Sequence, residues 1–412
     1  MKNELKELRE LAKVYAEYAF SDKNIQTPDQ YRQLNSLKMV RPPVLVFEVP
    51  WGEMAYDDEL RIRSESPLYR GIENAIRRDI FQFKYFGGDY AVHPYYMVKT
   101  RVIDRGMGLN VKENVISSTT GAYIAAHEYH DILPDEEALE MIQDPYLEID
   151  EEATNRALEA AHEVFDGIME VKRGGVQAYF AMWDEIPRFH GVTNSLMDLS
   201  DRPEFVHKLI DKFTTYKEKH LDLYEKLNIL ETDPYYLHCT PACTYELPIK
   251  DMDKEKIGAK DVWGRGMAQI FSTVSPQMHY DFDIKYMKRL FDRCGLTYYG
   301  CCEPLDRKIH ILKEFSNLRR ISITPWADVN IASEAMGRDY VLSAKSNPAF
   351  VSQTNFDKKP VIEETKKIIE ACKKNNTPFE FILKDISTIA NKRDNLTKWV
   401  ETVNQTITNY WG

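Results

Sequence analysis

The sequence predicts an α/β protein of the (β/α)8 TIM-barrel class, built as a single domain over residues 1–412. Short apolar runs alternate with longer helical patterns along the chain, which is typical of a parallel sheet with crossover helices. Hydrophobic residues make up 43% of the chain, which is enough to fill one large core. No internal repeat, low-complexity tract or Pro/Gly/Ser-rich linker divides the sequence.

Residues 1–40 predict a helical extension ahead of the barrel. The segment MKNELKELRELAKVYAEYAF is amphipathic with charges of both signs, and it lacks the apolar core and cleavage site of a signal peptide. No run of about 18 apolar residues could span a membrane. We therefore expect a cytoplasmic protein without a membrane partner. The stretch 101–150 is less regular and acidic at its end, so we expect an insertion or an elaborated loop there.

The apolar runs that are candidates for barrel strands outnumber the eight strands of the fold by one. We therefore expect either the run at 235–239 or the run at 268–274 to be a loop. The runs are PVLVFEV (43–49), YAVHPYY (90–96), VQAYFAM (176–182), YYLHC (235–239), AQIFSTV (268–274), LTYYGCC (296–302), RRISITPW (319–326), YVLSA (340–344) and FEFILKD (379–385).

Start signals predict several helices between these runs. Pro203 stands in the first turn of a long periodic segment that follows polar residues. Ser275 and Pro276 open a second helix in the order of cap and then proline. Asn330 or Ser333 is expected to cap the short helix IASEAMG.

The charge balance disfavours nucleic acid as a partner. Asp and Glu outnumber Lys and Arg by 65 to 54, which gives a net charge of -11. Such a surface repels phosphate backbones, and no basic run interrupts it. No GxGxxG or GxxxxGK[ST] loop in a strand-turn-helix context and no GxSxG elbow occurs, so no nucleotide cofactor is predicted. We expect a small-molecule substrate.

The motif YYGCCEP places two thiols at the end of a predicted strand, where barrel enzymes carry their chemistry. Neighbouring residues of a strand point to opposite faces, so only one of Cys301 and Cys302 can face the barrel mouth. A thiolate there could hold zinc with His238 or Cys239 and with Glu48 or Glu303 as an oxygen ligand. Small buried residues packed between strand and helix are the alternative reading, since free cysteine is often buried.

Two carboxylates at strand ends are predicted to be catalytic. Glu48 lies in an apolar run, where an unpaired charge would be costly, so it must ligate, pair with a cation or have a raised pKa. Glu303 directly follows the cysteines and is similarly placed. Aromatic residues and a lysine near strand ends predict a cleft for a flat or methylated substrate, although core packing explains any single one of the aromatics. These candidates are Trp51, Tyr95, Trp183, Trp263, Trp326 and Lys345.

The order of these motifs resembles that of the uroporphyrinogen decarboxylase superfamily over residues 40–400. The resemblance rests on RPPVLVFEV, FKYFGGDYAV, LSDRPEFVHKLID, VSPQMHYDFDIKYMKRL, YYGCCEP, LRRISITPWADV and SAKSNPAFV. It implies the TIM-barrel fold and a homodimer. It also implies one of two activities, because the superfamily holds the porphyrinogen decarboxylases of haem synthesis and zinc-dependent, corrinoid-linked methyltransferases.

The chain departs from both branches of the superfamily. Decarboxylases carry an arginine-rich turn after the first strand, where this chain has EVPWGEM, and an aspartate after the second strand, where it has HPYY. The methyltransferases bind zinc through His-x-Cys at a strand end and a distant Cys, and only Cys302 of GCC falls on a position of that motif. The resemblance then requires further zinc ligands from elsewhere, and His238, Cys239 and Glu48 are the candidates.

The methyltransferase branch resembles this chain more closely. It implies methyl transfer between a small methylated substrate and a corrinoid protein, with zinc assisting. The corrinoid is expected on a separate protein, because no DxHxxG segment occurs. Two alternatives stay open: a lyase of the same fold that acts on a small carboxylated substrate without metal, and a barrel that binds a ligand without catalysis. Zinc that is lost in Cys302→Ser would separate the first reading from the others.

Overall fold

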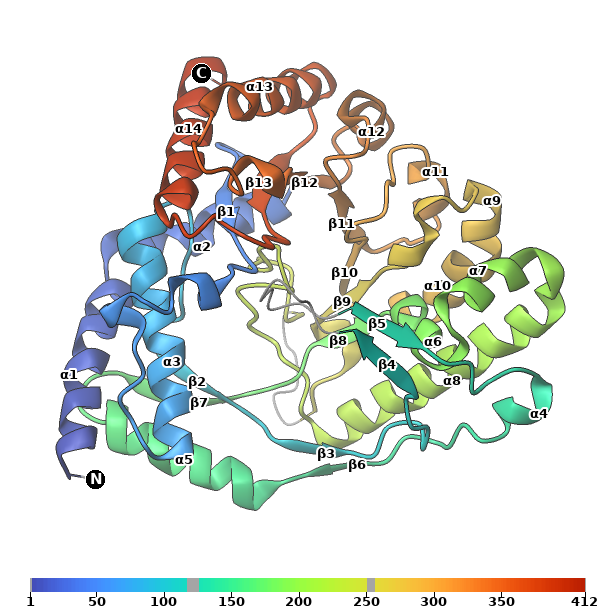
Figure 1. Cartoon of the computed structure of the whole chain (residues 1–412), viewed down its shortest axis with the longest axis horizontal. Helices are drawn as coiled ribbons and strands as arrows, with labels where there is room; N and C mark the ends of the chain where they lie inside the picture. Colours follow the sequence, from blue (N-terminus) through green and yellow to red (C-terminus); the bar gives the residue numbers. More distant parts are fainter. Residues whose placement is uncertain (1, 117–125, 250–255, 412) are drawn as a thin grey trace.

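A parallel sheet surrounded by helices forms the centre of the molecule (Figure 1). The computed structural model describes residues 2–116, 126–249 and 256–411. In these ranges, seven strands follow the order β1-β13-β12-β11-β10-β9-β8, and neighbours pair in parallel. The first strand lies beside the last, as in a barrel, so the predicted (β/α)8 class is confirmed. The strands are β1 (Val44–Val46), β8 (Ala178–Phe180), β9 (Trp263–Gly266), β10 (Leu296–Tyr299), β11 (Leu318–Ile323), β12 (Val341–Ser346) and β13 (Phe379–Leu383).

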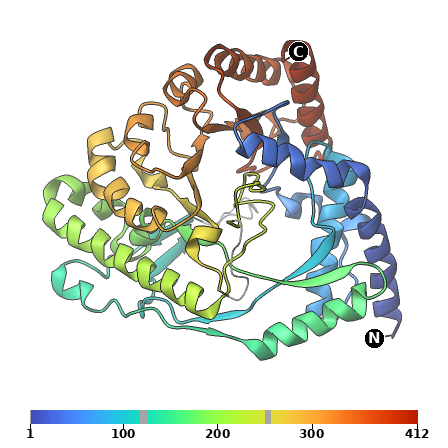
Figure 2. The ribbon, with the colours of Figure 1, turned by 180° about the vertical axis from the view of Figure 1, so that it is seen from behind.

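Helices lie around the outside of this sheet, as Figure 1 and the view from behind in Figure 2 show. None of the helices in the described ranges is long and apolar enough to cross a membrane. The longer helices are α1 (Lys2–Ala19), α2 (Asp22–Asn35), α3 (Pro67–Phe81), α5 (Glu151–Phe165), α6 (Met182–His190), α7 (Val192–Asp201), α8 (Pro203–Leu227), α10 (Lys285–Phe291), α12 (Val329–Met336), α13 (Lys358–Asn375) and α14 (Asp394–Tyr410). The short ones are η1 (Trp51–Met54), η2 (Asp58–Leu60), η3 (Gln82–Phe86), α4 (Glu136–Leu139), η4 (Ala259–Asp261), η5 (Gln269–Ser272), α9 (Pro276–His279), η6 (Tyr280–Ile284), α11 (Ile309–Leu312) and η7 (Pro348–Phe350).

Helix starts follow the sequence signals except at α12. Helix α8 begins at Pro203 as predicted. The helix predicted from Ser275 is divided into α9, η6 and α10. Asn330 and Ser333 were wrong as caps for α12, because both lie inside the helix, and Asp328 caps it by accepting the Asn330 N–H at 2.9 Å.

Two helices, α1 and α2, stand in the region predicted as a helical extension. Helix α1 packs Leu8 and Tyr15 against Ile76 of α3 and Phe165 of α5, which forms a second, smaller core. Four short strands of the region 101–150 form two antiparallel ladders outside the main sheet. These ladders are β3 (Val102–Asp104) with β6 (Leu147–Ile149), and β4 (Glu113–Ile116) with β5 (Ala126–Tyr129).

The predicted strand at 90–96 is wrong in its position. Only its last residues are a strand, and this strand, β2 (Tyr95–Lys99), pairs in parallel with β7 (Glu170–Gly174) outside the main sheet. Just before it, the Asp89 N–H donates to the Val44 carbonyl at 2.8 Å, so the chain does lie beside β1. Pro94 has no N–H to donate, which explains why the ladder does not continue there.

The strand β9 lies in neither of the two runs, 235–239 and 268–274, that the sequence offered as alternatives for a barrel strand. Residues 235–239 form bends, and the run at 268–274 contains the 3-10 helix η5. The sequence of β9 is WGRG, and its glycines let helix α10 and Cys294, three residues beyond the end of that helix, approach the strand. A Cβ on Gly264 would meet Cys294 Sγ at 2.6 Å, and one on Gly266 would meet Met287 Sδ at 2.6 Å. Because glycine interrupts the apolar pattern, a search for apolar runs cannot find this strand.

Charged side chains lie buried inside the barrel. Arg320 of β11 and Glu380 of β13 form an ion pair in which both side chains are fully buried. The Glu380 carboxylate also accepts the hydroxyls of Thr240 and Ser343 at 2.5 Å each. The interior is therefore a polar network in which each charge depends on its partner.

Candidate active site

A cluster of polar side chains lies at the C-terminal edge of the sheet, where barrel enzymes carry their chemistry. Cys301 and Cys302 follow β10, and their sulfurs lie 3.6 Å apart. Lys384 follows β13, and its Nζ lies 3.0 Å from Cys301 Sγ. We call this cluster the thiol site; its members are Glu48, His238, Cys301, Cys302, Lys384 and Asp385.

Glu48 joins His238 and Asp385 across the thiol site. Its Oε1 lies 2.6 Å from His238 Nε2, and its Oε2 accepts the Asp385 backbone N–H at 3.1 Å. The Asp385 carboxylate lies 3.0 Å from Lys384 Nζ and accepts the Cys302 thiol at 3.2 Å. Four segments that are distant in the sequence therefore bring acids, bases and thiols to one place.

The backbone is left-handed at three residues of the thiol site. The φ angles of Glu48, His238 and Asp385 are 51°, 53° and 54°. Such angles cost about 1–3 kcal/mol each for residues other than glycine, and they cluster at functional sites. All three residues belong to the thiol site. The left-handed backbone at each of them therefore helps to point their side chains toward one another.

The two thiols are held in different protonation states. Cys302, which can donate to Cys301, and then His238 and Lys384 lower the pKa of the Cys301 thiol well below its ordinary range, although burial opposes this. The contact with Cys301, together with burial, raises the pKa of the Cys302 thiol. Burial alone would lower the pKa of Lys384, but the neighbouring sulfurs and Glu48 raise it above its ordinary range. At neutral pH the site therefore holds a Cys301 thiolate beside an ammonium group.

Glu48 and His238 form an ionised pair. Hydrogen bonds with Cys301 and Glu48 raise the pKa of His238, while burial opposes the change. Burial would raise the pKa of Glu48, but hydrogen bonds with His238 and Asp385 and the charge of Lys384 bring it below its ordinary range. The imidazole is therefore oriented by a carboxylate on one side and lies against the reactive sulfur on the other.

Glu303, which was predicted to be catalytic, supports the thiol site from inside the protein. Its side chain is fully buried, and its two oxygens accept the N–H groups of Ala268 at 3.1 Å and Cys301 at 2.9 Å. Burial raises the pKa of Glu303 to about 7. In this place the side chain fixes the backbone of Cys301, so it is a positioning residue.

Lys345 and Cys239 lie in the barrel interior near the thiol site. Lys345 is only 3% exposed and donates to Ser343 Oγ at 2.7 Å and to the Cys239 carbonyl at 3.3 Å. Cys239 is fully buried against Tyr31 and Leu45, and this burial raises the pKa of its thiol. The carbonyl of Cys239 thus accepts from Lys345, while the charges of Lys345 and Lys384 act on its buried thiol.

Arg265 of β9 is a buried cation that forms no ion pair within the described part of the chain. Its guanidinium carbon lies 4.8 Å from the centre of the Tyr179 ring, and Nη2 lies 3.7 Å from the sulfur of Met267. No carboxylate of the described residues forms an ion pair with it, and its Nε has no hydrogen-bond partner there. The Arg265 charge opposes protonation of His238, which places it near the thiol site. Such a group is suited to bind an anion.

The predicted aromatic residues do not gather around one cleft. Trp183 and Trp263 are buried in the core, and each indole N–H donates to a backbone carbonyl at 2.9 Å. Trp51 packs on the rings of η3 and α3, and Trp326 is 71% exposed. Tyr95 lines a separate cavity. Core packing, the alternative reading, accounts for the buried indoles, since large rings fill the space between sheet and helices.

Three residues at or near the thiol site were not singled out from the sequence. Lys384 and Asp385 end the run FEFILKD, so their position after a strand was the available signal. Arg265 stands between two glycines in a strand that has no apolar run. No sequence pattern marks it, because its role depends on which side chains surround it.

Gly300→Ala is expected to destabilise the protein by about 1–3 kcal/mol. Gly300 has a φ of +95°, and a Cβ there would meet Leu305 Cδ1 at 2.5 Å. Gly71→Ala is the matched control, because Gly71 lies in α3 with no atom within 4 Å of the added Cβ. It should stabilise by about 0.4–1 kcal/mol. Urea unfolding measures both changes, and equal stabilities would contradict the role assigned to Gly300.

Lys384→Met is expected to raise the pKa of the Cys301 thiol by about 1–3 units, because it removes the cation 3.0 Å from the sulfur. Thiolate absorbance in the far ultraviolet, followed against pH in chelator-treated protein, measures the change after subtraction of the Cys301→Ser spectrum. The thiolate should persist to lower pH in wild type than in the variant. Lys313→Met, at an exposed lysine, is the control. An unchanged midpoint in Lys384→Met would refute the electrostatic account.

The donors of the thiol site suit zinc chemically, since zinc accepts mixed sets of thiolate, imidazole and carboxylate. They are not arranged as a metal site, however. No group of three or more His, Cys, Asp or Glu side chains in the described ranges is placed to hold a metal ion. Instead, the Lys384 ammonium lies among the donors. Zinc binding therefore stays a prediction.

Comparison with known proteins finds similarity in structure but not in sequence. No protein-family model and no curated protein matches the chain. A methyltransferase from Methanosarcina mazei is similar in structure with a TM-score of 0.51, over 91% of this chain and 98% of that chain, at 10% sequence identity. At this identity the similarity establishes the fold alone, and the uroporphyrinogen decarboxylase resemblance stays a prediction.

Proposed function

We propose that the protein is a methyltransferase that works at the thiol site. The observation that carries this proposal is the position of Cys301 Sγ, which lies 3.0 Å from Lys384 Nζ and beside His238 at the C-terminal edge of the barrel, where both neighbours lower the pKa of the thiol. A thiolate is both a strong nucleophile and a soft metal ligand, and both properties serve methyl transfer. The solved methyltransferase of the same fold supports this kind of chemistry.

We further propose zinc as the cofactor, with Cys301, Cys302 and His238 as ligands and Glu48 as an oxygen donor. When bound, zinc would supply Lewis acidity and keep the ligating thiols deprotonated. Both thiols must lose their protons to bind zinc. The charge of Lys384 acts to lower the pKa of each thiol, which reduces the free-energy cost of deprotonation. Cys239 is not included, because its thiol is fully buried and this burial raises its pKa.

The methyl group would move between a small methylated substrate and a corrinoid on a separate protein. The thiol site is open enough for this, since the side chains of Asp385 and His238 are 49% and 39% exposed. Glu48 would keep the imidazole oriented, and Lys384 would balance the negative charge of the sulfurs. We also expect a homodimer, which light scattering of the purified protein would test.

Metal analysis and a methyl-transfer assay test the proposal together. Protein purified without added metal should contain about one zinc per chain, and Co²⁺-substituted protein should show thiolate-to-cobalt charge-transfer absorption. With methylcobalamin and 2-mercaptoethanol as probes, the protein should speed transfer of the methyl group to sulfur, with cob(I)alamin as the leaving group. Protein without zinc that does not demethylate methylcobalamin would overturn the proposal.

A metal-free lyase for a small carboxylated substrate is the second candidate, and Arg265 favours it. A buried guanidinium without a carboxylate partner among the described residues could bind the carboxylate of a substrate. In that case chelator-treated protein should bind succinate, and Arg265→Gln should weaken binding at least about tenfold. Calorimetry measures both. Absence of zinc, of methyl transfer and of succinate binding would leave the ligand-binding barrel as the remaining reading.

A further inference from the structure

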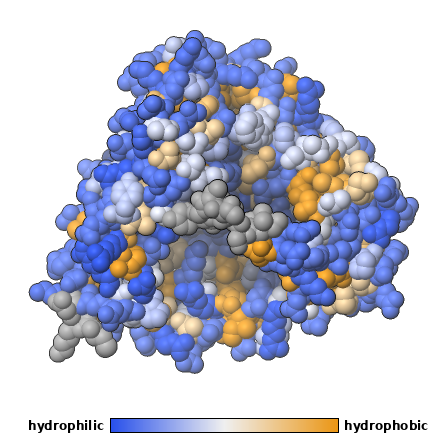
Figure 3. Space-filling view, viewed as in Figure 1, coloured by the Kyte–Doolittle hydropathy of each residue, from blue (hydrophilic) through white to orange (hydrophobic). Residues whose placement is uncertain are grey.

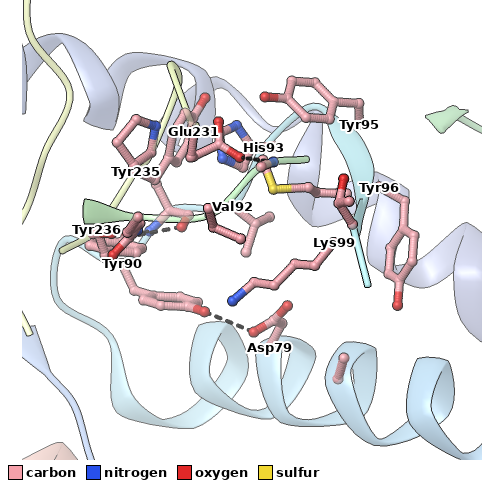
Figure 4. A pocket seen from close by; sticks show the side chains of 18 of the residues that line it. Asp79, Tyr90, Val92, His93, Tyr95, Tyr96, Lys99, Glu231, Tyr235 and Tyr236 are labelled. Carbon is pink, nitrogen blue, oxygen red and sulfur yellow. Dashed lines mark hydrogen bonds between the residues drawn. The ribbon is translucent and has the colours of Figure 1, made fainter. Parts of the chain in front are cut away.

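A second cavity lies apart from the thiol site, between α3, the segment that leads into β2 and the segment 231–236 (Figure 4). Its volume is about 520 Å³, within the range of small-molecule sites. No residue of the thiol site lines it. Its walls are unusually rich in phenol rings, contributed by Tyr15, Tyr90, Tyr95, Tyr96, Tyr235 and Tyr236.

A carboxylate, that of Asp79, faces this cavity and forms no ion pair within the described ranges. Asp79 of α3 accepts the Tyr90 hydroxyl at 2.8 Å, as the dashed line in Figure 4 shows. Burial raises the pKa of Asp79 to about 6, only the hydrogen bond from Tyr90 opposes it, and no cation of the described residues contributes. Lys99 also lines the cavity, and in Figure 4 its side chain extends toward Asp79, but among the described residues no ion pair joins the two. A half-buried carboxylate of this kind gains from a cation that enters from outside.

The one imidazole of the cavity wall adds no positive charge. Burial lowers the pKa of His93 to about 4, so its ring is neutral at pH 7. The ring lies between those of Tyr95 and Tyr235, with centroid distances of 4.6 Å and 3.7 Å. On its outer side, the Tyr95 hydroxyl donates to the Asp233 carboxylate at 2.9 Å. The cavity thus combines aromatic faces with a negative balance of charge.

We propose that this cavity binds a small organic cation, an alkylated ammonium group held between the Asp79 carboxylate and the tyrosine rings. Ring faces attract such cations, and the attraction is strongest where water is excluded. A carboxylate adds charge pairing that an uncharged ligand of the same shape cannot use. This site goes beyond the proposed function, because methyl transfer at the thiol site uses none of these side chains.

Calorimetry with a pair of probes tests the site. Choline and its uncharged isostere 3,3-dimethylbutan-1-ol have nearly the same shape, so their difference reports the charge. We expect choline to bind at least about tenfold more tightly than the alcohol. Asp79→Asn, which keeps an acceptor for the Tyr90 hydroxyl, should weaken choline binding at least about tenfold. Cys302→Ser is the matched control at the thiol site and should leave choline binding unchanged.

Tyr96→Leu provides a second variant if Asp79→Asn does not fold, and it should weaken choline binding more than binding of the alcohol. Equal affinity for the two probes, no binding of choline, or an unchanged affinity in folded Asp79→Asn would each overturn the proposal. If Cys302→Ser lost choline binding while Asp79→Asn kept it, the cation would bind at the barrel mouth, and the proposal would be overturned as well. Tighter binding of benzoate than of choline would assign recognition to Lys99 and would also contradict it.

Discussion

Replacing Cys301 or Cys302 by serine is expected to remove the zinc that we propose for the thiol site and to slow methyl transfer by at least about 100-fold. The two sulfurs lie 3.6 Å apart beside Lys384. Serine would replace a sulfur by a hydroxyl group, which does not ionise at neutral pH. Atomic emission of the dialysed variants measures zinc, and the methylcobalamin assay measures the rate. Loss of metal and of rate should occur together, since both depend on the same thiolates.

Cys372→Ser is the matched control for these variants. Cys372 is buried in α13, remote from the thiol site in the fold, and its thiol has its pKa raised by burial. It should keep its zinc and its rate. If Cys301→Ser and Cys302→Ser both retain one zinc per chain, the assignment of ligands is wrong, whatever the activity shows.

Glu380→Gln is expected to destabilise the protein by about 3–5 kcal/mol, the largest change in stability predicted for a single site. The substitution keeps an oxygen that can accept the hydroxyls of Thr240 and Ser343. It removes the charge that faces Arg320, and the fully buried guanidinium is then left unpaired. Urea unfolding monitored by circular dichroism measures the free energy of unfolding.

The double variant Arg320→Met with Glu380→Gln tests the cause of that loss. It removes both charges, so its stability should return to within about 1–2 kcal/mol of wild type. Glu370→Gln is a control at an exposed pair, because Glu370 lies 3.6 Å from Lys366 on the surface of α13. It should change stability by less than about 1 kcal/mol. A double variant as unstable as Glu380→Gln alone would show that packing, not charge, sets the cost.

Elements with strong local patterns were predictable from the sequence. The runs that became β10, β11, β12 and β13 are rich in apolar and aromatic residues and are almost wholly buried, as strands covered on both faces require, although β11, β12 and β13 also carry buried charges. Helix α8 begins at Pro203, because proline is favoured in the first turn of a helix. The strand β9 was missed, because the close approach of α10 requires the glycines Gly264 and Gly266 where an apolar pattern would otherwise stand.

The space-filling view also shows why surface character says little about the thiol site (Figure 3). Polar residues cover most of this face, and apolar ones appear in scattered groups over the barrel. Hydropathy alone does not distinguish the six residues of the thiol site from other polar residues. What distinguishes the thiol site is the short distances between its side chains and their protonation states, and a hydropathy scale describes neither.

The sequence by itself determined the barrel class and the position of Cys301 and Cys302 after a strand, because both follow from patterns within a few residues. Only the tertiary structure decided the partners of these thiols. Strand alternation predicts that just one sulfur faces the barrel mouth, but the turn at Gly300 ends the strand and brings both to Lys384. His238 joins them from a segment more than sixty residues away in the sequence, and such long-range contacts are set by how the strands pack, not by any local pattern.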